Sequence, residues 1–293
     1  MTKHKNSTII SSLLFMALIS FANTVFATDY YLSNTGNDNS KGTSPLTPWQ
    51  TINKLNTAKL KPGDRIFFKG GDRFLGEIEI NNSGTDEKPI IISSYSNGEK
   101  PVLTGAKSIS NFENYKTNIY KSKEEIFIKT LYINNIMQNI ARYPNSGVLT
   151  FSNQDEFIGK SSKKTADNPN GKSECQFRDN NLNQPNGYWN GSSIRYRAID
   201  WEWGVNEIVS WKDGIFTLKD SYRYGFSKGY GFILENKLEE LDTIGEWCYD
   251  DKAKELFIYS ENISNSTIEG VVYDYGIKLA DNVGNIKISN LSF

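Results

Sequence analysis

Short apolar segments alternate with clusters of turn-forming residues along the first third of the chain. Clusters rich in Gly, Asn, Asp and Ser stand at 69–72, 81–84 and 96–99. The segments around them carry an apolar residue every 12 positions, at Ile66, Ile78, Ile90 and Val102. Regular short segments of this kind predict the strands of a sandwich, a barrel or a β-solenoid.

One helix is predicted in this region, over residues 48–57. Thr47 can cap it and Pro48 suits its first position. Trp49, Ile52 and Leu55 recur on one face, and we expect this face to be buried.

The middle of the chain has a different pattern. Polar stretches at 161–171 and 179–190 indicate surface loops, and strands follow at 194–197, 206–211 and 215–218. The hairpin turn Lys212-Asp213-Gly214 joins the last two, so we expect antiparallel pairing. A second hairpin is predicted at 246–259, with its turn at 250–254, and the chain ends on an alternating strand at 286–293.

The first 27 residues have the pattern of a secretory signal peptide. Lys3, His4 and Lys5 form a basic start, an apolar run follows from Ile9 to about Ala22, and Val25-Phe26-Ala27 suits cleavage after Ala27. The apolar run is short for a bilayer span. We therefore expect a secreted or periplasmic protein without a stable membrane anchor.

The amino-acid composition excludes several classes of catalytic and binding site. His4 is the only histidine, so the cleaved chain has none, which excludes Ser-His-Asp triads, Cys-His pairs and His-ligated zinc. The net charge of −1 provides no basic field for nucleic acid. Aromatic residues make up 13% of the chain, which favours β structure and surfaces that stack on sugars. The spacing of Cys175 and Cys248 leaves both a disulfide and two separate thiols open.

A series of motifs resembles a known family. In chain order they are Tyr30-Tyr31-Leu32-Ser33, Gly36-Asn37-Asp38, Gly42-Thr43-Ser44-Pro45, Pro48-Trp49, Leu60-Lys61-Pro62-Gly63-Asp64, Leu103-Thr104-Gly105, Ala141-Arg142-Tyr143-Pro144-Asn145 and Gly245-Glu246-Trp247. Together with the closing residues 285–293, they resemble the secreted bacterial right-handed parallel β-helix proteins. These proteins belong to the pectate-lyase-like superfamily, and the likeness is to the amino-terminal region of its chondroitinase-B and alginate-lyase type.

The resemblance implies an all-β fold. Its parts would be a right-handed parallel β-helix start with an N-terminal capping helix, and an inserted, mostly antiparallel β module. We expect a signal peptide at 1–27, an N-terminal β-helix region at 28–139, the inserted module at 140–245, and resumed, incomplete coils at 246–293. In this family the active-site cleft lies along further coils. We therefore expect a chain truncated at its C-terminus, inactive alone, with the catalytic residues beyond Phe293.

The main candidate for substrate contact is Asp200-Trp201-Glu202-Trp203. On a strand, Trp201 and Trp203 would share one face and could form a platform for sugar rings. Arg195 and Arg197 could pair with uronate carboxylates. Arg195, Arg197, Trp201 and Trp203 are thus the predicted substrate-binding residues. The alternative is that one face of this strand is ordinary core.

Two other polar clusters are predicted to form turns and not a metal site or a catalytic pair. Lys41 occupies a position where a calcium loop at 36–42 would need an oxygen ligand, so an Asx turn is expected there. Asp250-Asp251 heads a polar hairpin turn, although such a pair could serve glycoside hydrolysis. The catalytic residues are unknown, and no metal or cofactor is evident in this segment. Calcium is conceivable in the full-length protein.

The predicted function is that of a polysaccharide lyase on uronic-acid-containing extracellular glycans. Elimination at a uronate needs its carboxylate neutralised, by Arg or calcium, and a base, and neither role requires histidine. The alternatives are a glycoside hydrolase of the same fold and a non-catalytic carbohydrate-binding or surface protein, because a fold does not determine a function.

Overall fold

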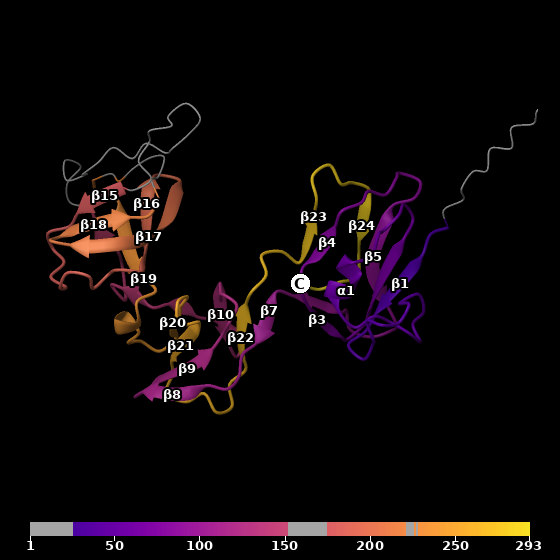
Figure 1. The fold of residues 1–293 in the computed structure, drawn as a ribbon, viewed down its shortest axis with the longest axis horizontal. Helices are drawn as coiled ribbons and strands as arrows, with labels where there is room; N and C mark the ends of the chain where they lie inside the picture. Colours follow the sequence, from indigo (N-terminus) through magenta and orange to yellow (C-terminus); the bar gives the residue numbers. More distant parts are fainter. Residues whose placement is uncertain (1–25, 152–174, 221–225, 227) are drawn as a thin grey trace, which may run out of the picture. The chain divides into compact units, whose positions relative to one another are not determined.

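The computed structural model describes residues 26–151, 175–220, 226 and 228–293 (Figure 1). Across this part of the chain, strands β1 to β24 are joined by turns and loops, and helix is almost absent. The all-β class is confirmed. The chain forms two compact units. Unit 1 contains the described residues up to Asp72 with Glu79–Pro101 and Leu279–Ser292, and unit 2 contains Arg73–Ile78, Val102–Lys278 and Phe293.

Unit 1 is built on a parallel sheet with the strand order β1-β2-β5-β24. The four strands are Asp29–Leu32, Arg65–Lys69, Ile90–Tyr95 and Ile286–Ile288. Side chains alternate between the two faces of a strand, and on the inner face Leu32, Ile66, Phe68, Ile90 and Ile92 are fully buried. Strand β24 thus lies in the same sheet as β1, although the two are far apart in the sequence.

Parallel pairing also joins β3 (Arg73–Leu75) to β6 (Val102–Thr104). The short strand β4 (Ile78–Ile80) pairs with β23 (Ile277–Leu279). All four segments with the 12-residue spacing are therefore strands, as predicted. The described residues form no closed solenoid, so the right-handed parallel β-helix is not confirmed.

The helix α1 spans Ile52–Asn56 and is shorter than predicted. Its N-cap is Thr51, whose Oγ1 accepts a hydrogen bond from Lys54 N at 3.1 Å. The Asp38 carboxylate in turn accepts from Thr51 N at 3.0 Å and Thr51 Oγ1 at 2.7 Å. The predicted cap at Thr47 was wrong, because a carboxylate from another loop fixes the start of the helix at Thr51.

Trp49 precedes the helix and lies beside β1, in a parallel bridge with Leu32. Trp49, Ile52 and Leu55 are all buried, as predicted. Gly42 has a φ of +70°, and a β-carbon there would lie 2.3 Å from the Trp49 ring. Both the backbone conformation and the close approach of the indole therefore require glycine at this position.

Unit 2 contains two sheets of mainly antiparallel pairing. The first has the order β11-β10-β22-β7, formed by Ile136–Met137, Thr130–Ile133, Ile268–Val271 and Ala106–Ser108. The second has the order β12-β20-β21-β9-β8, formed by Asn139–Ile140, Glu246–Asp250, Glu255–Tyr259, Ile119–Lys123 and Glu113–Lys116. A 3-10 helix, η2 (Leu238–Glu240), precedes β20. Antiparallel pairing thus begins at β7, earlier along the chain than the β-helix border predicted at residue 139.

A seven-stranded antiparallel sheet completes unit 2. Its strands are β13 (Arg142–Tyr143), β14 (Leu149–Thr150), β15 (Cys175–Arg178), β16 (Ser193–Ile199), β17 (Glu202–Lys212), β18 (Ile215–Leu218) and β19 (Gly231–Glu235). One face packs a mainly aromatic core that includes Trp189, Tyr196, Trp211, Phe216 and Phe232. The predicted antiparallel pairing is present, whereas the module borders at 140 and 245 stay predictions.

The structure also tests the predicted hairpin turns and the state of Cys248. The hairpin turns at 212–214 and 250–254 join β17 to β18 and β20 to β21. The Cys248 thiol is free and buried. The predicted loop at 161–171 and most of the signal peptide lie outside the described residues. Among the described residues, no helix is long and apolar enough to cross a membrane.

Candidate functional site

The hairpin of β16 and β17 has one buried and one solvent-facing side. Arg197 pairs with Trp203 across the two strands, and Arg195 pairs with Val205. Ile194, Tyr196 and Ala198 belong to the aromatic core, as does Ile208 on β17. Gly204 and Asn206 are buried on the same side of β17. The outward side therefore carries the predicted arginines beside Trp203 and Val205.

Both predicted tryptophans are exposed to solvent. Trp201 is 78% exposed and Trp203 is 47% exposed. Trp201 lies in the turn between β16 and β17, not on a strand as the sequence predicted, because the register shifts at the end of this hairpin. Large apolar side chains are normally buried, so two exposed indoles this close in the chain favour a contact surface.

Arg197 is held by its neighbours. Its guanidinium lies 5.4 Å from the centre of the Tyr230 ring, and its Nη2 donates to the Asp200 carbonyl oxygen at 2.5 Å. The Tyr230 hydroxyl donates to the Asp200 carboxylate at 2.7 Å. That hydrogen bond raises the pKa of the Tyr230 phenol, so the ring stays neutral at physiological pH. Sequence reasoning missed Tyr230, which comes from a segment 30 residues after Asp200 and adjoins the face only in the fold.

Arg195 is paired with a carboxylate of the same sheet. Its Nε donates to both carboxylate oxygens of Glu235, at 2.9 Å and 3.1 Å. Glu235 lies on β19, opposite Ser193, and its side chain is only 10% exposed. The charge of Arg195 is therefore largely compensated within the protein, which leaves it less free for a uronate carboxylate than the sequence suggested.

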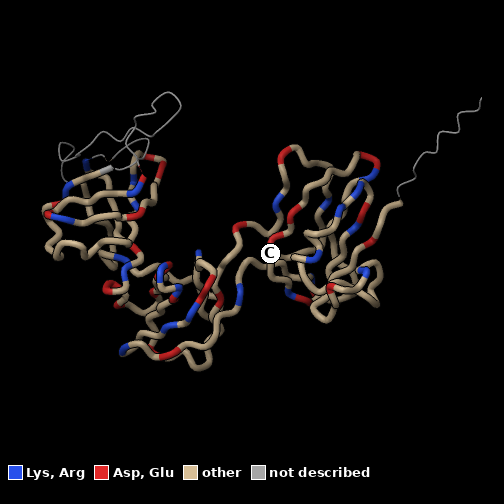
Figure 2. Tube along the Cα trace, viewed as in Figure 1, with Lys and Arg blue, Asp and Glu red and all other residues tan. Residues whose placement is uncertain are grey.

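These side chains form what we call the hairpin face, consisting of Arg195, Arg197, Trp201, Trp203, Val205 and Tyr230. It offers aromatic planes and an apolar side chain, while Arg195 is hydrogen-bonded to Glu235, and Arg197 and Tyr230 are hydrogen-bonded to Asp200. Charges of both signs are interspersed along the described chain (Figure 2), so no strong field of one sign surrounds the face. Such a surface suits ligands with apolar planes and neutral hydroxyl groups.

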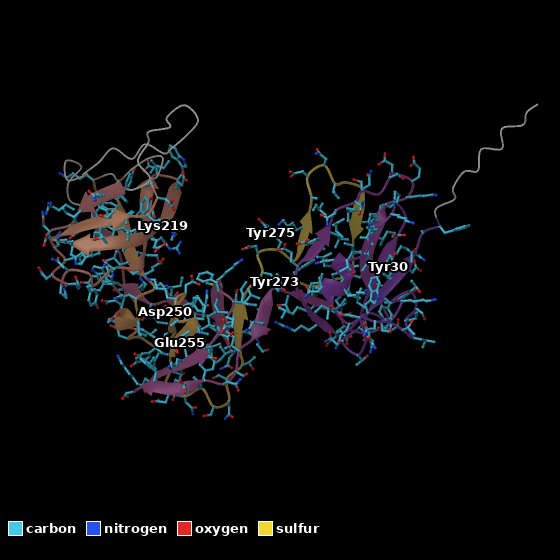
Figure 3. The ribbon with its side chains drawn as sticks, viewed as in Figure 1. Tyr30, Lys219, Asp250, Glu255, Tyr273 and Tyr275 are labelled. Atoms are coloured by element: carbon cyan, nitrogen blue, oxygen red, sulfur yellow. The ribbon has the colours of Figure 1, made fainter. Side chains whose placement is uncertain are left out.

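A second candidate surface is a hollow of about 390 Å³ within unit 2. Tyr132, Tyr273 and Tyr275 line it, and the last two are labelled in Figure 3. An ion pair of 2.7 Å between Arg73 and Glu269 lies in the same lining. Its volume is at the low end of that found for small-ligand pockets. This hollow could not be predicted from the sequence, because its lining residues come from distant segments of the chain.

The remaining candidates are structural. The Asp250 carboxylate accepts from Lys252 N at 2.9 Å and Ala253 N at 3.0 Å, while Asp251 pairs with Lys254 at 2.7 Å. Both carboxylates thus stabilise the turn after β20. In the 36–42 loop, Asp38 binds the start of α1, as described above. No group of three or more His, Cys, Asp or Glu side chains in the described residues is arranged to hold a metal ion.

Comparison with known proteins gives partial matches. No family model matches the chain. A lacto-N-biosidase of Bifidobacterium longum subsp. longum is 31% identical over 112 residues, which is 35% of this chain and 7% of that protein. The chain therefore spans only a small part of this curated relative. The crystal structure of a GH136 lacto-N-biosidase from Eubacterium ramulus is 31% identical and covers 28% of this chain and 14% of its own, with a TM-score of 0.26.

A solved structure described as a glycoside hydrolase matches the whole fold more fully. It covers 90% of this chain and 50% of its own, with a TM-score of 0.63 and 15% sequence identity. At that identity the likeness concerns the fold. The all-β fold described above is thus one that occurs in a carbohydrate-active enzyme.

Proposed function

We propose that this chain belongs to an exported glycoside hydrolase and contacts extracellular glycans through the hairpin face. The observation that carries the proposal is the exposure of Trp201 and Trp203 on a fold similar to that of a glycoside hydrolase. The partial match to a lacto-N-biosidase adds support from sequence. The whole protein would act on a polysaccharide or oligosaccharide with residues that lie outside the hairpin face.

We also infer that the parallel strands are the first coils of a right-handed β-helix. Support comes from the parallel order β1-β2-β5-β24 and from the parallel pair β3–β6. Three consecutive turns of chain that each place a strand beside the previous one would give this pairing. Burial of Trp49 next to β1 fits a cap on the first coil.

Hydrolysis is favoured over the lyase reaction that the sequence first suggested. A uronate lyase needs a cation free to neutralise the substrate carboxylate. On the hairpin face Arg195 is paired with Glu235 and Arg197 with Asp200, so neither is presented alone. The matched proteins described above are a lacto-N-biosidase and a glycoside hydrolase, and neither is described as a lyase. Glycoside hydrolysis was the alternative, and it is the better supported of the two.

Binding to glycans tests the hairpin face directly. The purified chain is titrated by calorimetry with neutral oligosaccharides that contain N-acetylhexosamine and with oligouronates. Trp201→Ala combined with Trp203→Ala should reduce glycan affinity at least about fivefold, since each stacking contact contributes about 0.5–1.5 kcal/mol. Val209→Ala, on the same exposed side of β17, is the matched control and should change little. Full affinity in the double variant would exclude the hairpin face.

Analysis of the reaction products of the protein that contains this chain separates the candidate reactions. A hydrolase releases saturated sugars, whereas a lyase releases products that absorb ultraviolet light through their new double bond. If the longer protein binds glycans and releases neither, the non-catalytic carbohydrate-binding alternative is correct.

A further inference from the structure

The Asp64 carboxylate is 1% exposed and binds the backbone nitrogen of Thr28. Thr28 N donates to Oδ1 at 2.7 Å, and Lys61 N donates to Oδ2 at 2.8 Å. A buried carboxylate is costly unless a cation or several hydrogen bonds compensate its charge. Thr28 is also the residue that follows the cleavage position expected after Ala27.

We propose that removal of residues 1–27 creates an α-ammonium group at Thr28 that forms a buried ion pair with Asp64. A peptidase for exported proteins would hydrolyse the Ala27–Thr28 bond with one water molecule. The hydroxyl of the water goes to the Ala27 carbonyl carbon and a proton goes to the Thr28 nitrogen. At neutral pH the new carboxyl group loses its proton and the new amine gains one, so charges balance.

The surroundings of this bond suit both cleavage and the pair that follows it. Phe26 and Ala27 are exposed, so the chain before Thr28 is accessible to a protease. Arg65 N donates to the Thr28 carbonyl oxygen at 2.9 Å. That bond comes from β2 and does not depend on the residues before Thr28. A hollow of about 640 Å³ beside Thr28 leaves room for water on the other N–H groups of an ammonium.

The other charges near Thr28 leave Asp64 as its partner. Asp29 is held by Arg65 through two hydrogen bonds of 2.6 Å. Glu87 and Lys88 line the hollow with Asp29 and Arg65, and Lys61 contacts Asp64 through its backbone. The Tyr30 phenol is the remaining titratable group, and burial followed by the Asp64 charge raises its pKa. Below pH 10 Tyr30 is therefore neutral and does not compete with Asp64 for the ammonium group.

The ion pair between Thr28 and Asp64 makes the free energy of unfolding depend on removal of residues 1–27 and on pH. An ammonium stabilised by Asp64 has a higher pKa in the folded chain than in the unfolded chain, where it is about 7.7–8.0. The contribution is therefore fully present below that unfolded value and is lost as the pH rises through the folded value. The cleaved chain would reach its full stability only after export.

The test compares two forms of residues 28–293, one with a free amine at Thr28 and one acetylated there. Urea unfolding is followed between pH 6 and 9.5, and the α-amino pKa is measured by NMR. We expect that pKa to rise by about one unit or more, equivalent to about 1.4 kcal/mol, and the free form to be more stable below pH 8. Asp64→Asn should abolish the difference between the forms, while Asp29→Asn, the matched control, should preserve it.

N-terminal sequencing of the chain exported from a bacterial host completes the test. A start at Thr28 is expected, and a start at any other residue would overturn the proposal. So would an α-amino pKa at its unfolded value, or equal stability of the free and acetylated forms at pH 7. If Asp64→Asn fails to fold, the comparison of the two wild-type forms decides alone. None of these readouts depends on glycan binding, so failure leaves the proposed function untouched.

Discussion

The Trp49 indole is held from several sides at once. The Tyr30 ring stacks on it with 4.9 Å between ring centres, and its Nε1 donates to the Ser40 carbonyl oxygen at 3.0 Å. We expect Trp49→Ala to lower the free energy of unfolding by about 3–5 kcal/mol, because a large cavity would open beside β1. Urea denaturation measures this directly. A loss below about 1 kcal/mol would mean that the indole packs only peripherally.

Asp38 makes the start of α1 sensitive to acid. Burial alone would raise its pKa, but hydrogen bonds from Thr51 and Gln50 outweigh burial, and its pKa is lowered. A lowered carboxyl pKa gives stability that is present above the unfolded value of about 3.9 and is lost as the pH falls through the folded value. We expect the stability difference between wild type and Asp38→Asn to shrink below pH 4. A difference that stays constant from pH 3 to pH 7 would contradict this role.

Single residues show what the sequence could predict and what it could not. Trp201 and Trp203 are both exposed, as a role in surface contacts requires. The alternation of buried and exposed residues along β16 and β17 places other side chains in the core. The partners of Arg195 and Arg197 were not predictable. Glu235 and Tyr230 reach them from β19 and the loop before it, and no local pattern marks that pairing.

At the scale of elements, the β16–β17 hairpin depends on a missing side chain. Gly204 lies opposite Tyr196, and a β-carbon there would be 2.9 Å from the Cζ atom of this fully buried ring. Gly204→Ala should therefore destabilise the chain by about 1–3 kcal/mol through overpacking. Gly284→Ala, where a β-carbon meets nothing within 4 Å, is the control. Equal melting temperatures for the two variants would show that Tyr196 can move aside.

Strand positions were easier to predict than strand partners. The apolar spacing located β2, β4, β5 and β6, since alternation and turn residues are local signals. It could not show that β6 pairs parallel with β3 while β7 pairs antiparallel with β22, because pairing direction is set by distant segments. The helix α1 was displaced for the same reason, since Asp38 caps it from another loop.

At the scale of the whole molecule, the composition limits the possible chemistry more firmly than any single motif. Absence of histidine from the expected mature chain excludes catalysis by histidine and still permits acid–base chemistry by carboxylates. The family resemblance predicted the all-β class correctly but placed the lyase first. That order followed from a reaction that needs no histidine and from the position of the carboxylate pair Asp250-Asp251 in a predicted turn.

The charge arrangement leads to a last prediction about glycan binding. The net charge is −1, and both arginines of the hairpin face already have acidic partners in the sheet or its turn. Binding should therefore depend on stacking, which salt hardly affects, and neutral oligosaccharides should bind with less than about a twofold change in affinity between low and high salt. Oligouronates should bind no more tightly than neutral sugars. Calorimetry at about 0.05 M and about 0.5 M sodium chloride measures both. A steep loss of oligouronate affinity with salt would instead reveal a cationic site, and it would restore the lyase reaction as the better hypothesis.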